Sequence, residues 1–431
     1  MALIQEYRKN RIWIHTVLAL LAAGLVFCGS AAAALVPANS PRVKTMGRWI
    51  PDDNGNLYAG RGAVIASVEF EGTGVQAQMF SDSQGDVWWL KKLDDGPMTR
   101  FKPQMGLNIL YQGLPYGKHT LTMIRETEGM RGVTILCGFN FAGEKEPEAE
   151  GTAQSARKKE PAANETETAA DRNEKATGKK GKAKNETGTA ADKNVKAAGK
   201  TDTKHGDTPL VEVPRRRSIE IIGDSVAAGA FIYPDGDYFE RESGYLAFGP
   251  RLARMLDADW SCVASSGEGA VRNNEEKYPY TAKHAEAQIE QAFYTQMEPR
   301  WDNRMDAPDL VILAYGENDF NDIVNSPSDV YFKKQYKNLL LKLRKFRPDS
   351  VIFCTTPANI VTSRRATPGM SGAVEELRAE GDTKLYFIDL NEQGQLLDRS
   401  DFLDGVHPLA SGHEKIARYL LEQVRTILGW N

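Results

Sequence analysis

A serine, a histidine and an aspartate have the types and spacing of a nucleophile with its general base. Ser225 ends a Gly-Asp-Ser segment that follows an apolar stretch and precedes small residues. A serine at such a strand-to-helix turn exposes its hydroxyl, which suits a nucleophile. His407 would take the serine proton, and Asp404, three residues earlier, would hold the imidazole in the required tautomer. Because Gly-Asp-Ser alone is also typical of an ordinary turn or N-cap, the interpretation depends on further blocks.

Two such blocks could stabilise the oxyanion that forms when an ester carbonyl is attacked. Ser-Gly-Glu-Gly (266–269) and Gly-Glu-Asn-Asp (316–319) each follow a predicted strand. Gly267 lets a backbone N–H approach closely, and the Asn318 amide donates a hydrogen bond without adding a titrating charge. We therefore predict an oxyanion hole made of the Ser225 N–H, the Gly267 N–H and the Asn318 side chain.

Other polar and aromatic residues have simpler interpretations. Glu317 and Asp319 could tune the site or merely end the strand, and strand termination is the favoured prediction. Trp88, Trp89 and Trp301 could form a sugar platform or a core. Tryptophans at paired strand positions more often belong to a core, which is the prediction for all three.

These blocks lie in a region, 210–431, whose pattern alternates strands with helices. Strands are predicted over 218–225, 260–267, 309–316, 350–357 and 384–390, and helices over 245–258, 330–346 and 410–428. The central strands are nearly continuous apolar runs, as expected when helices cover both faces of a parallel sheet. In such a doubly wound α/β domain the ligand site lies at the carboxyl ends of the strands, where the polar blocks fall.

The region 42–143 has a different pattern. Short stretches of alternating polarity recur between Gly, Asp and Pro, including 63–72, 75–82, 107–114 and 119–128, with a predicted hairpin over 113–129. Several strands at close spacing without a helical period predict an all-β antiparallel sandwich of jelly-roll type.

The first 34 residues are typical of a secretory signal peptide. A basic start containing Arg8 and Arg11 precedes an apolar run (12–27) and small residues at 31–34. An uncleaved anchor is one alternative because the apolar run is long, and lipidation of Cys28 is another, which the preceding phenylalanine disfavours. The prediction is a secreted, surface-displayed or periplasmic protein.

Residues 144–209 are predicted to be a disordered linker. Their only bulky apolar residue is Val195, and such a composition cannot bury enough surface to offset chain entropy. A short repeat, NETETAAD and NETGTAAD, indicates expansion by duplication. With 431 residues in total, one folded domain is expected on each side of the linker.

The net charge and the spacing of Cys and His residues limit which partners and cofactors can be predicted. The chain has 54 basic and 58 acidic residues, a formal charge of −4, which gives no electrostatic case for nucleic acid. No Cys/His cluster has zinc-ligand spacing, so neither a metal nor another cofactor is predicted. Cys137, Cys262 and Cys354 would remain after cleavage of the leader, and buried free thiols are expected rather than disulfides.

The four polar blocks, in this order, resemble the SGNH (GDSL-type) hydrolase superfamily, which implies a flavodoxin-like domain and the roles given above. Together with Gly60-Arg61, GLPYGKHTLTMIRETEG, IIGDS, SSGEGAVRNN and PDLVILAYGENDF, they resemble carbohydrate esterase family 2. That family couples a jelly-roll domain to an SGNH domain and deacetylates plant polysaccharides such as xylan and glucomannan. This chain departs from the family in its long linker and in Val406, which stands before His407 where the family tends to have an aromatic residue or glycine.

The leading hypothesis is a serine esterase that removes O-acetyl groups from an acetylated polysaccharide. The same residues would serve an esterase acting on peptidoglycan or an exopolysaccharide. A carbohydrate-binding surface protein with an inert SGNH domain is a third alternative, which the intact catalytic set disfavours. A lipase is a fourth, although no long apolar lid is evident. No membrane partner is predicted apart from an N-terminal anchor, and the sequence predicts no oligomeric state.

Overall fold

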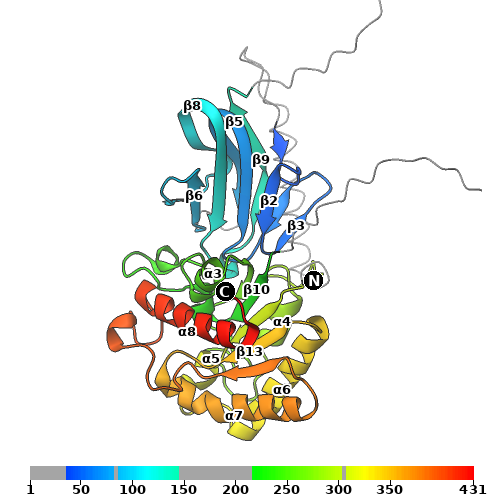
Figure 1. Ribbon diagram of the computed structural model, residues 1–431, viewed down its shortest axis with the longest axis vertical. Coiled ribbons are helices and arrows are strands. Elements are labelled where there is room, and N and C mark those ends of the chain that lie inside the picture. Colours follow the sequence, from blue (N-terminus) through cyan, green and yellow to red (C-terminus); the bar gives the residue numbers. More distant parts are fainter. Residues whose placement is uncertain (1–34, 82–85, 145–215, 303–306) are drawn as a thin grey trace, which may run out of the picture. The chain divides into compact units, whose positions relative to one another are not determined.

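The computed structural model describes residues 35–81, 86–144, 216–302 and 307–431 (Figure 1). The predicted leader and nearly all of the predicted linker lie outside these residues. The described chain contains an antiparallel all-β domain and a C-terminal α/β domain with a parallel sheet, as the sequence predicted. Among the helices of the described ranges, none has both the length and the apolar character needed to cross a membrane.

The N-terminal domain is built from nine strands. They are β1 (Val36–Pro37), β2 (Val43–Met46), β3 (Trp49–Pro51), β4 (Leu57–Ala59), β5 (Ile65–Ser81), β6 (Trp89–Leu93), β7 (Thr99–Phe101), β8 (Gly106–Arg125) and β9 (Thr134–Ala142). All pair antiparallel in one hydrogen-bonded sheet of order β3-β4-β9-β5-β8-β6-β7, with β1 on β9 and β2 on β5. Alternate residues of β5, such as Ala66, Val68 and Phe70, are buried in the core, which is the period of a strand with one solvated face.

The two longest strands correct the sequence prediction. Strands predicted separately over 63–72 and 75–82 form one strand, β5, and the hairpin predicted over 113–129 is wrong because the chain continues straight as β8. The register shifts at this point, since Gly72 pairs with Gly117 whereas Gly74 pairs with Gln112. Glycine and proline are typical of bulges as well as of turns, and here the extra residues form a bulge against β5.

The C-terminal domain contains a five-stranded parallel sheet. Its strands are β10 (Ser218–Gly223), β11 (Asp259–Ala264), β12 (Leu310–Ala314), β13 (Val351–Thr355) and β14 (Leu385–Ile388). Their order, β11-β10-β12-β13-β14, is that of flavodoxin-like folds. All five predicted strands are confirmed, and the central strand β12 is fully buried from Leu310 to Leu313, as its apolar run predicted.

Helices cover both faces of this sheet (Figure 1). They are α2 (Ser225–Ala228), α3 (Phe248–Met255), α4 (Ala285–Glu290), α5 (Glu317–Phe320), α6 (Asp329–Phe346), α7 (Ile360–Ala379) and α8 (Ala410–Leu428), with short 3-10 turns η1 (Gly129–Arg131), η2 (Tyr238–Arg241) and η3 (Arg399–Asp401). Leu252 of α3 and Leu420 of α8 share one core, and Leu339 of α6 and Met370 of α7 share the core on the other face.

The three predicted helices are confirmed, but α7 was not predicted. Pro368 lies inside it, and Gly369 and Gly372 follow, a combination that weakens a helical pattern in sequence. Tertiary packing explains the helix. A Cβ added to Gly369 would lie 2.6 Å from the ring of Phe332 in α6, so the glycine permits close approach of the two helices.

The cysteines, Trp89 and Trp301 follow the sequence interpretation, whereas the core prediction is wrong for Trp88. Within the described residues the three cysteines are free and buried, as predicted. Trp89 and Trp301 are core residues. Trp88 is half-buried, with the Arg100 guanidinium and the Lys102 ammonium over its ring at 4.6 and 4.7 Å from the centroid.

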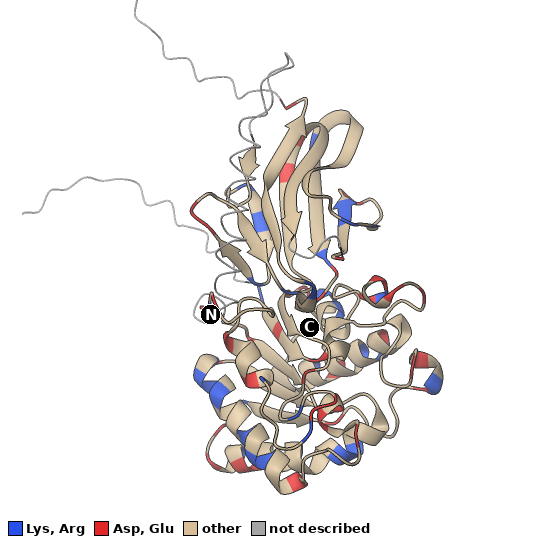
Figure 2. Cartoon of the chain, turned by 180° about the vertical axis from the view of Figure 1, so that it is seen from behind, with Lys and Arg blue, Asp and Glu red and all other residues tan. Residues whose placement is uncertain are grey.

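Charged residues of both signs lie next to one another on the helices (Figure 2). On α6 and α7, Lys333 and Lys337 pair with Glu376 at 2.8 and 3.0 Å. This mixing of charges on the two helices agrees with the small net charge of the chain.

Candidate active site

The turn after β10 places Ser225 at the start of α2. Asp224 is the N-cap of that helix, and its carboxylate accepts the Val226 N–H at 3.0 Å. Gly223 permits the turn, because a Cβ there would lie 2.6 Å from both the Ala227 Cβ and the Ala314 carbonyl oxygen. Ser225 therefore stands at the carboxyl end of the first strand of the sheet, as the sequence predicted for this position.

Ser225, His407 and Asp404 lie in one hydrogen-bonded chain. The Ser225 Oγ is 3.0 Å from His407 Nε2, and His407 Nδ1 is 2.7 Å from Asp404 Oδ2. This is the separation at which an imidazole can take the proton of a hydroxyl while a carboxylate holds the other ring nitrogen. Ser225 is 182 residues from His407 in sequence, so the fold brings the pair together.

The Asp404 side chain holds the turn that carries it and His407 by accepting hydrogen bonds from the backbone of that turn. Asp404 Oδ1 accepts the His407 N–H at 2.8 Å and the Val406 N–H at 3.0 Å. Burial alone would raise the pKa of Asp404, but the hydrogen bonds from His407 and Val406 keep that pKa below its usual range. Asn359 adds a hydrogen bond to the Gly405 carbonyl at 3.2 Å. Asp404 is thus held ionised against the imidazole.

The predicted oxyanion donors also lie at strand ends. Gly267 follows β11 with φ +78°, a left-handed conformation that favours glycine. Among the described residues, neither the Ser225 N–H nor the Gly267 N–H has a hydrogen-bond partner. Asn318 lies in α5, and its Nδ2 donates one hydrogen to the Glu268 carbonyl at 2.8 Å. The second hydrogen on Nδ2 is left for another acceptor.

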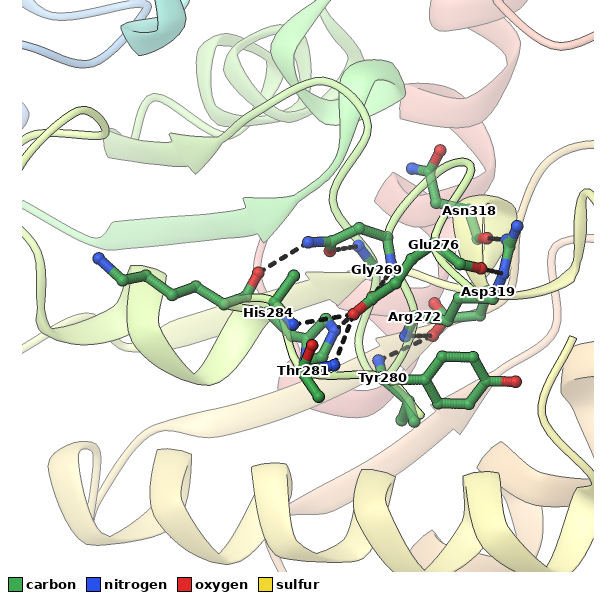
Figure 3. Close-up of polar contacts among 12 residues, drawn as sticks. Gly269, Arg272, Glu276, Tyr280, Thr281, His284, Asn318 and Asp319 are labelled. Atoms are coloured by element: carbon green, nitrogen blue, oxygen red, sulfur yellow. Dashed lines mark hydrogen bonds and ion pairs between the residues drawn. The ribbon is translucent and has the colours of Figure 1, made fainter. Parts of the chain in front are cut away.

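Asp319 has a larger role than the predicted strand termination. It is fully buried, and its carboxylate accepts the backbone N–H groups of Ala270, Val271 and Arg272 at 2.9, 2.7 and 2.9 Å (Figure 3). Arg272 in turn donates from its guanidinium to the carbonyl of Asn318. Asp319 and Arg272 therefore tie the segment after Gly267 to the segment that carries Asn318.

Glu276 fixes the next part of the same segment. Its carboxylate accepts the N–H groups of Thr281 and Ala282 at 2.7 and 2.8 Å and lies 2.7 Å from His284 Nε2 (Figure 3). Burial would raise the pKa of Glu276, but these hydrogen bonds lower it below its usual range. His284 therefore has a structural role in this segment.

Glu317, the other acidic neighbour of Asn318, is buried beneath the site. The Thr362 hydroxyl donates to its carboxyl group at 2.6 Å. Burial raises the pKa of Glu317 to about 7, and the negative charge of Asp404 acts in the same direction. Its position at the first turn of α5 gives it contacts that a plain strand terminus would lack.

Sequence reasoning missed two aromatic residues beside the histidine. The Phe231 ring centroid lies 4.7 Å from that of His407, and Tyr238 packs edge-on against Phe231 at 4.8 Å. Phe231 has a positive φ of 58°, which neither its residue type nor its neighbours indicate. Val406 offers no ring at the position before His407, and Phe231 supplies an aromatic contact from a different loop.

Two family models match the two domains. Residues 221–415 match the GDSL-like lipase/acylhydrolase family, and residues 45–149 match the N-terminal domain of carbohydrate esterase 2. The chain therefore combines a GDSL-type hydrolase domain with a carbohydrate esterase 2 N-terminal domain. Within the described residues, no group of three or more His, Cys, Asp or Glu side chains is arranged to hold a metal ion.

Relatives of this chain include proteins named as carbohydrate esterases. The cellulase/esterase CelE of Acetivibrio thermocellus is 23% identical over 91% of this chain, which spans 40% of that protein. An acetylxylan esterase/glucomannan deacetylase of Cellvibrio japonicus is 23% identical over 92% of this chain and 91% of its own length.

Solved structures share the fold. A family two carbohydrate esterase from Cellvibrio japonicus has a TM-score of 0.69 at 20% identity, covering 93% of this chain and 99% of its own. A family two esterase from Clostridium thermocellum in complex with cellohexaose has a TM-score of 0.64 at 20% identity, covering 90% of this chain and 100% of its own.

Proposed function

We propose that this protein is a serine esterase that removes O-acetyl groups from a polysaccharide of the xylan or glucomannan type. The observation that carries the proposal is the chain from Ser225 Oγ through His407 to Asp404, next to two backbone N–H groups without partners among the described residues. Such an arrangement supports acyl transfer, which requires a nucleophile, a base and oxyanion donors close together.

The reaction would proceed in two displacements. The Ser225 Oγ attacks the acetyl carbonyl carbon while His407 Nε2 takes the hydroxyl proton, and collapse of the tetrahedral intermediate passes that proton to the leaving sugar oxygen. Water then attacks the acetyl-serine with His407 again as base, and acetate leaves as Ser225 regains its proton. Asp404 keeps the imidazole oriented and stabilises its positive charge in both steps.

The carbonyl oxygen gains negative charge in each tetrahedral intermediate. We assign its stabilisation to the Ser225 N–H, the Gly267 N–H and the second hydrogen of Asn318 Nδ2. Fixed donors at such a position act mainly on charge that develops in the transition state.

The polysaccharide substrate is supported by the relatives and by the surroundings of His407. One relative is named an acetylxylan esterase/glucomannan deacetylase, and a structural neighbour was solved with cellohexaose bound. Phe231 and Tyr238 offer aromatic surface of the kind on which sugar rings stack. Export through the leader at 1–34 would bring the enzyme to such a substrate. Acetylated peptidoglycan or an exopolysaccharide is the alternative that keeps the same chemistry.

The test measures release of acetate by the full-length protein from three acetylated polymers, xylan, glucomannan and peptidoglycan. The small ester 4-nitrophenyl acetate is the fourth substrate. We expect release from the first two and from the small ester, with none from a Ser225→Ala variant. Release from peptidoglycan alone would favour the envelope alternative. Folded wild-type protein that releases acetate from none of them would refute the proposal.

A further inference from the structure

A buried glutamate of the β domain contacts the loop that carries Gly267. Glu128 follows β8 and is 1% exposed, and its Oε2 accepts the N–H of Ser266 at 2.5 Å. Its own N–H donates to Glu242 Oε1 at 2.8 Å. Residue 266 immediately precedes the glycine whose N–H we assign to the oxyanion hole. A side chain from 138 residues away therefore restrains the peptide just before the one that carries this N–H.

The backbone around Glu128 is fixed by Arg125. The guanidinium of Arg125 donates to the carbonyls of Thr127, Glu128 and Gly132 at 2.9, 3.2 and 2.7 Å. Arg125, Thr127 and Glu128 are each no more than 1% exposed. Glu128 is therefore presented to the loop from a rigid support, since hydrogen bonds in a dry environment do not exchange with water.

A second tether reaches the other side of Gly267. Arg61, before β5, donates to the Gln288 side-chain oxygen, and Gln288 Nε2 donates to Glu268 Oε1 at 2.6 Å. Arg61 Nη2 also donates to the Gln291 carbonyl at 3.3 Å. The residues on both sides of Gly267, Ser266 and Glu268, are thus held by hydrogen bonds that lead back to the β domain.

We propose that the β domain positions the oxyanion hole and that Glu128 is the positioning residue that sets the direction of the Gly267 N–H. The inference rests on the proposed function, because it takes the Gly267 N–H as an oxyanion donor. A glycine has the freest backbone of any residue, so its N–H stays aligned only if its neighbours are held. A donor contributes to the transition state only when it is aligned before the reaction.

Burying the Glu128 carboxyl group costs free energy, and this cost supports a functional role for the residue. Burial raises the pKa of Glu128 to about 7 and, with the negative charge of Glu128, raises the pKa of Glu242 well above its usual range. Apolar residues of similar volume would fill the same space without that desolvation penalty. Either protonation state of Glu128 still offers an oxygen to the Ser266 N–H.

The experiment compares Glu128→Ala with Glu128→Gln in the full-length protein, using 4-nitrophenyl acetate. Titration with a fluorophosphonate gives the fraction of active sites, so that kcat refers to folded enzyme. We expect Glu128→Ala to lower kcat about 10-fold or more with KM changed by less than about twofold, because ground-state binding does not need the aligned donor. Glu128→Gln should recover most of the rate, since its amide oxygen accepts the Ser266 N–H.

A boronic acid that forms a tetrahedral adduct with Ser225 separates positioning from stability. Its inhibition constant should rise in Glu128→Ala by about the factor by which kcat/KM falls, because the adduct places an oxygen in the same hole. The matched control is Glu126→Ala, which removes another buried carboxyl of the same segment, one that accepts the Ser243 and Tyr233 hydroxyls. We expect it to lower thermal stability while kcat per active site stays within about twofold.

The outcomes are distinct. A Glu128→Ala variant with wild-type kcat per active site, beside an inactive Ser225→Ala variant, would overturn the positioning role and leave the esterase proposal intact. An active Ser225→Ala variant would instead refute the proposed function. If Glu128→Ala does not fold, Glu128→Met fills the same space without an acceptor for the Ser266 N–H, and the same kcat and boronate measurements on that variant decide the matter in the same way.

Discussion

Two hydrogen-bonded networks meet around Gly267, and they differ in their access to water. The network of Ser225, His407 and Asp404 reaches solvent, with side-chain exposures of 17% for the histidine and 43% for the aspartate. The network that joins Arg61 and Glu128 to the neighbouring loop is dry, with both residues at most 1% exposed. The first must admit a substrate, whereas the second only has to stay in place.

The protonation of the carboxyl groups follows the same division. The pKa of Asp404 is held below its usual range by hydrogen bonds from the turn of His407 despite its burial. Burial instead raises the pKa of Glu128 to about 7 and of Glu268 to about 8. Compensation of a developing imidazolium needs a charged carboxylate, but positioning needs only an acceptor, which a neutral acid also provides.

The largest effect is expected from removing the proposed nucleophile and its proposed base. We expect Ser225→Ala and His407→Ala each to abolish acetate release, and the double variant to be hardly worse, because the two groups act as one unit. Asp404→Asn should be milder, since the Ser225–His407 pair and the oxyanion donors survive it. The measurement is acetate release with folding checked by circular dichroism, and losses that add in the double variant would refute the shared role.

Asn318 contacts the dry network at Glu268, and its loss should have the next largest effect. Its amide donates to the Glu268 carbonyl, and its second hydrogen is assigned to the oxyanion. Asn318→Ala should lower kcat by about 10²-fold with little change in KM, because an oxyanion donor acts on transition-state charge. Steady-state kinetics with 4-nitrophenyl acetate test this. An unchanged kcat with lowered thermal stability would make Asn318 a structural residue only.

The dry contacts between the β domain and the α/β domain give a third prediction. Arg48 is fully buried and pairs with Glu220 of β10 at 3.0 Å, while Arg347 holds both oxygens of the same carboxylate. The positive charges of the two arginines keep the pKa of Glu220 below its usual range despite its burial. Arg48→Met should lower the free energy of unfolding by about 3 kcal/mol or more, since Glu220 loses one of its two arginines and the buried carbonyls of Ile289 and Gln291 lose a donor.

Urea unfolding measures this loss, and Arg425→Met is the matched control. Arg425 pairs with Glu422 at 2.9 Å on the surface, and exposed pairs contribute little. If both arginine variants lose the same stability, burial does not distinguish the two kinds of ion pair in this protein.

The sequence predicted one network better than the other for a physical reason. Ser225, Gly267 and Asn318 each follow an apolar strand within a few residues, and parallel strands bring such positions to one edge. Nothing local indicates that Glu128 contacts Ser266, because the sequence predicts only a strand and a hairpin in this segment. Glu128 is 138 residues from its partner Ser266, and Arg61 is 227 residues from its partner Gln288. Contacts between buried charged side chains so far apart in sequence are seen only in the folded structure.

The smallest predicted effect concerns Glu268, the buried carboxyl that follows Gly267 in the sequence. Burial raises its folded-state pKa to about 8 from the ordinary 4.5, with the charge of Glu128 adding to the rise and that of Arg61 opposing it. Between these values the folded protein binds a proton that the unfolded chain has released. Stability from this group is therefore fully present below about pH 4.5 and is lost as the pH rises toward about 8.

Glu268→Gln removes this titration but keeps an oxygen that can accept from Gln288 Nε2. Urea unfolding at about pH 5 and about pH 8 should show the free energy of unfolding falling less steeply in the variant, with a gain of roughly 1–3 kcal/mol at the higher pH. Glu128 and Glu317, with pKa values of about 7, leave a residual slope of the same sign. His413, whose pKa burial lowers to about 3, gives the opposite slope, mainly below the ordinary histidine value of 6.5, in both proteins.

The exposed Glu422→Gln is the control that should leave the slope unchanged. Equal slopes in wild type and Glu268→Gln would mean that Glu268 is ionised in the folded protein, and the dry network would then hold a charge next to the oxyanion.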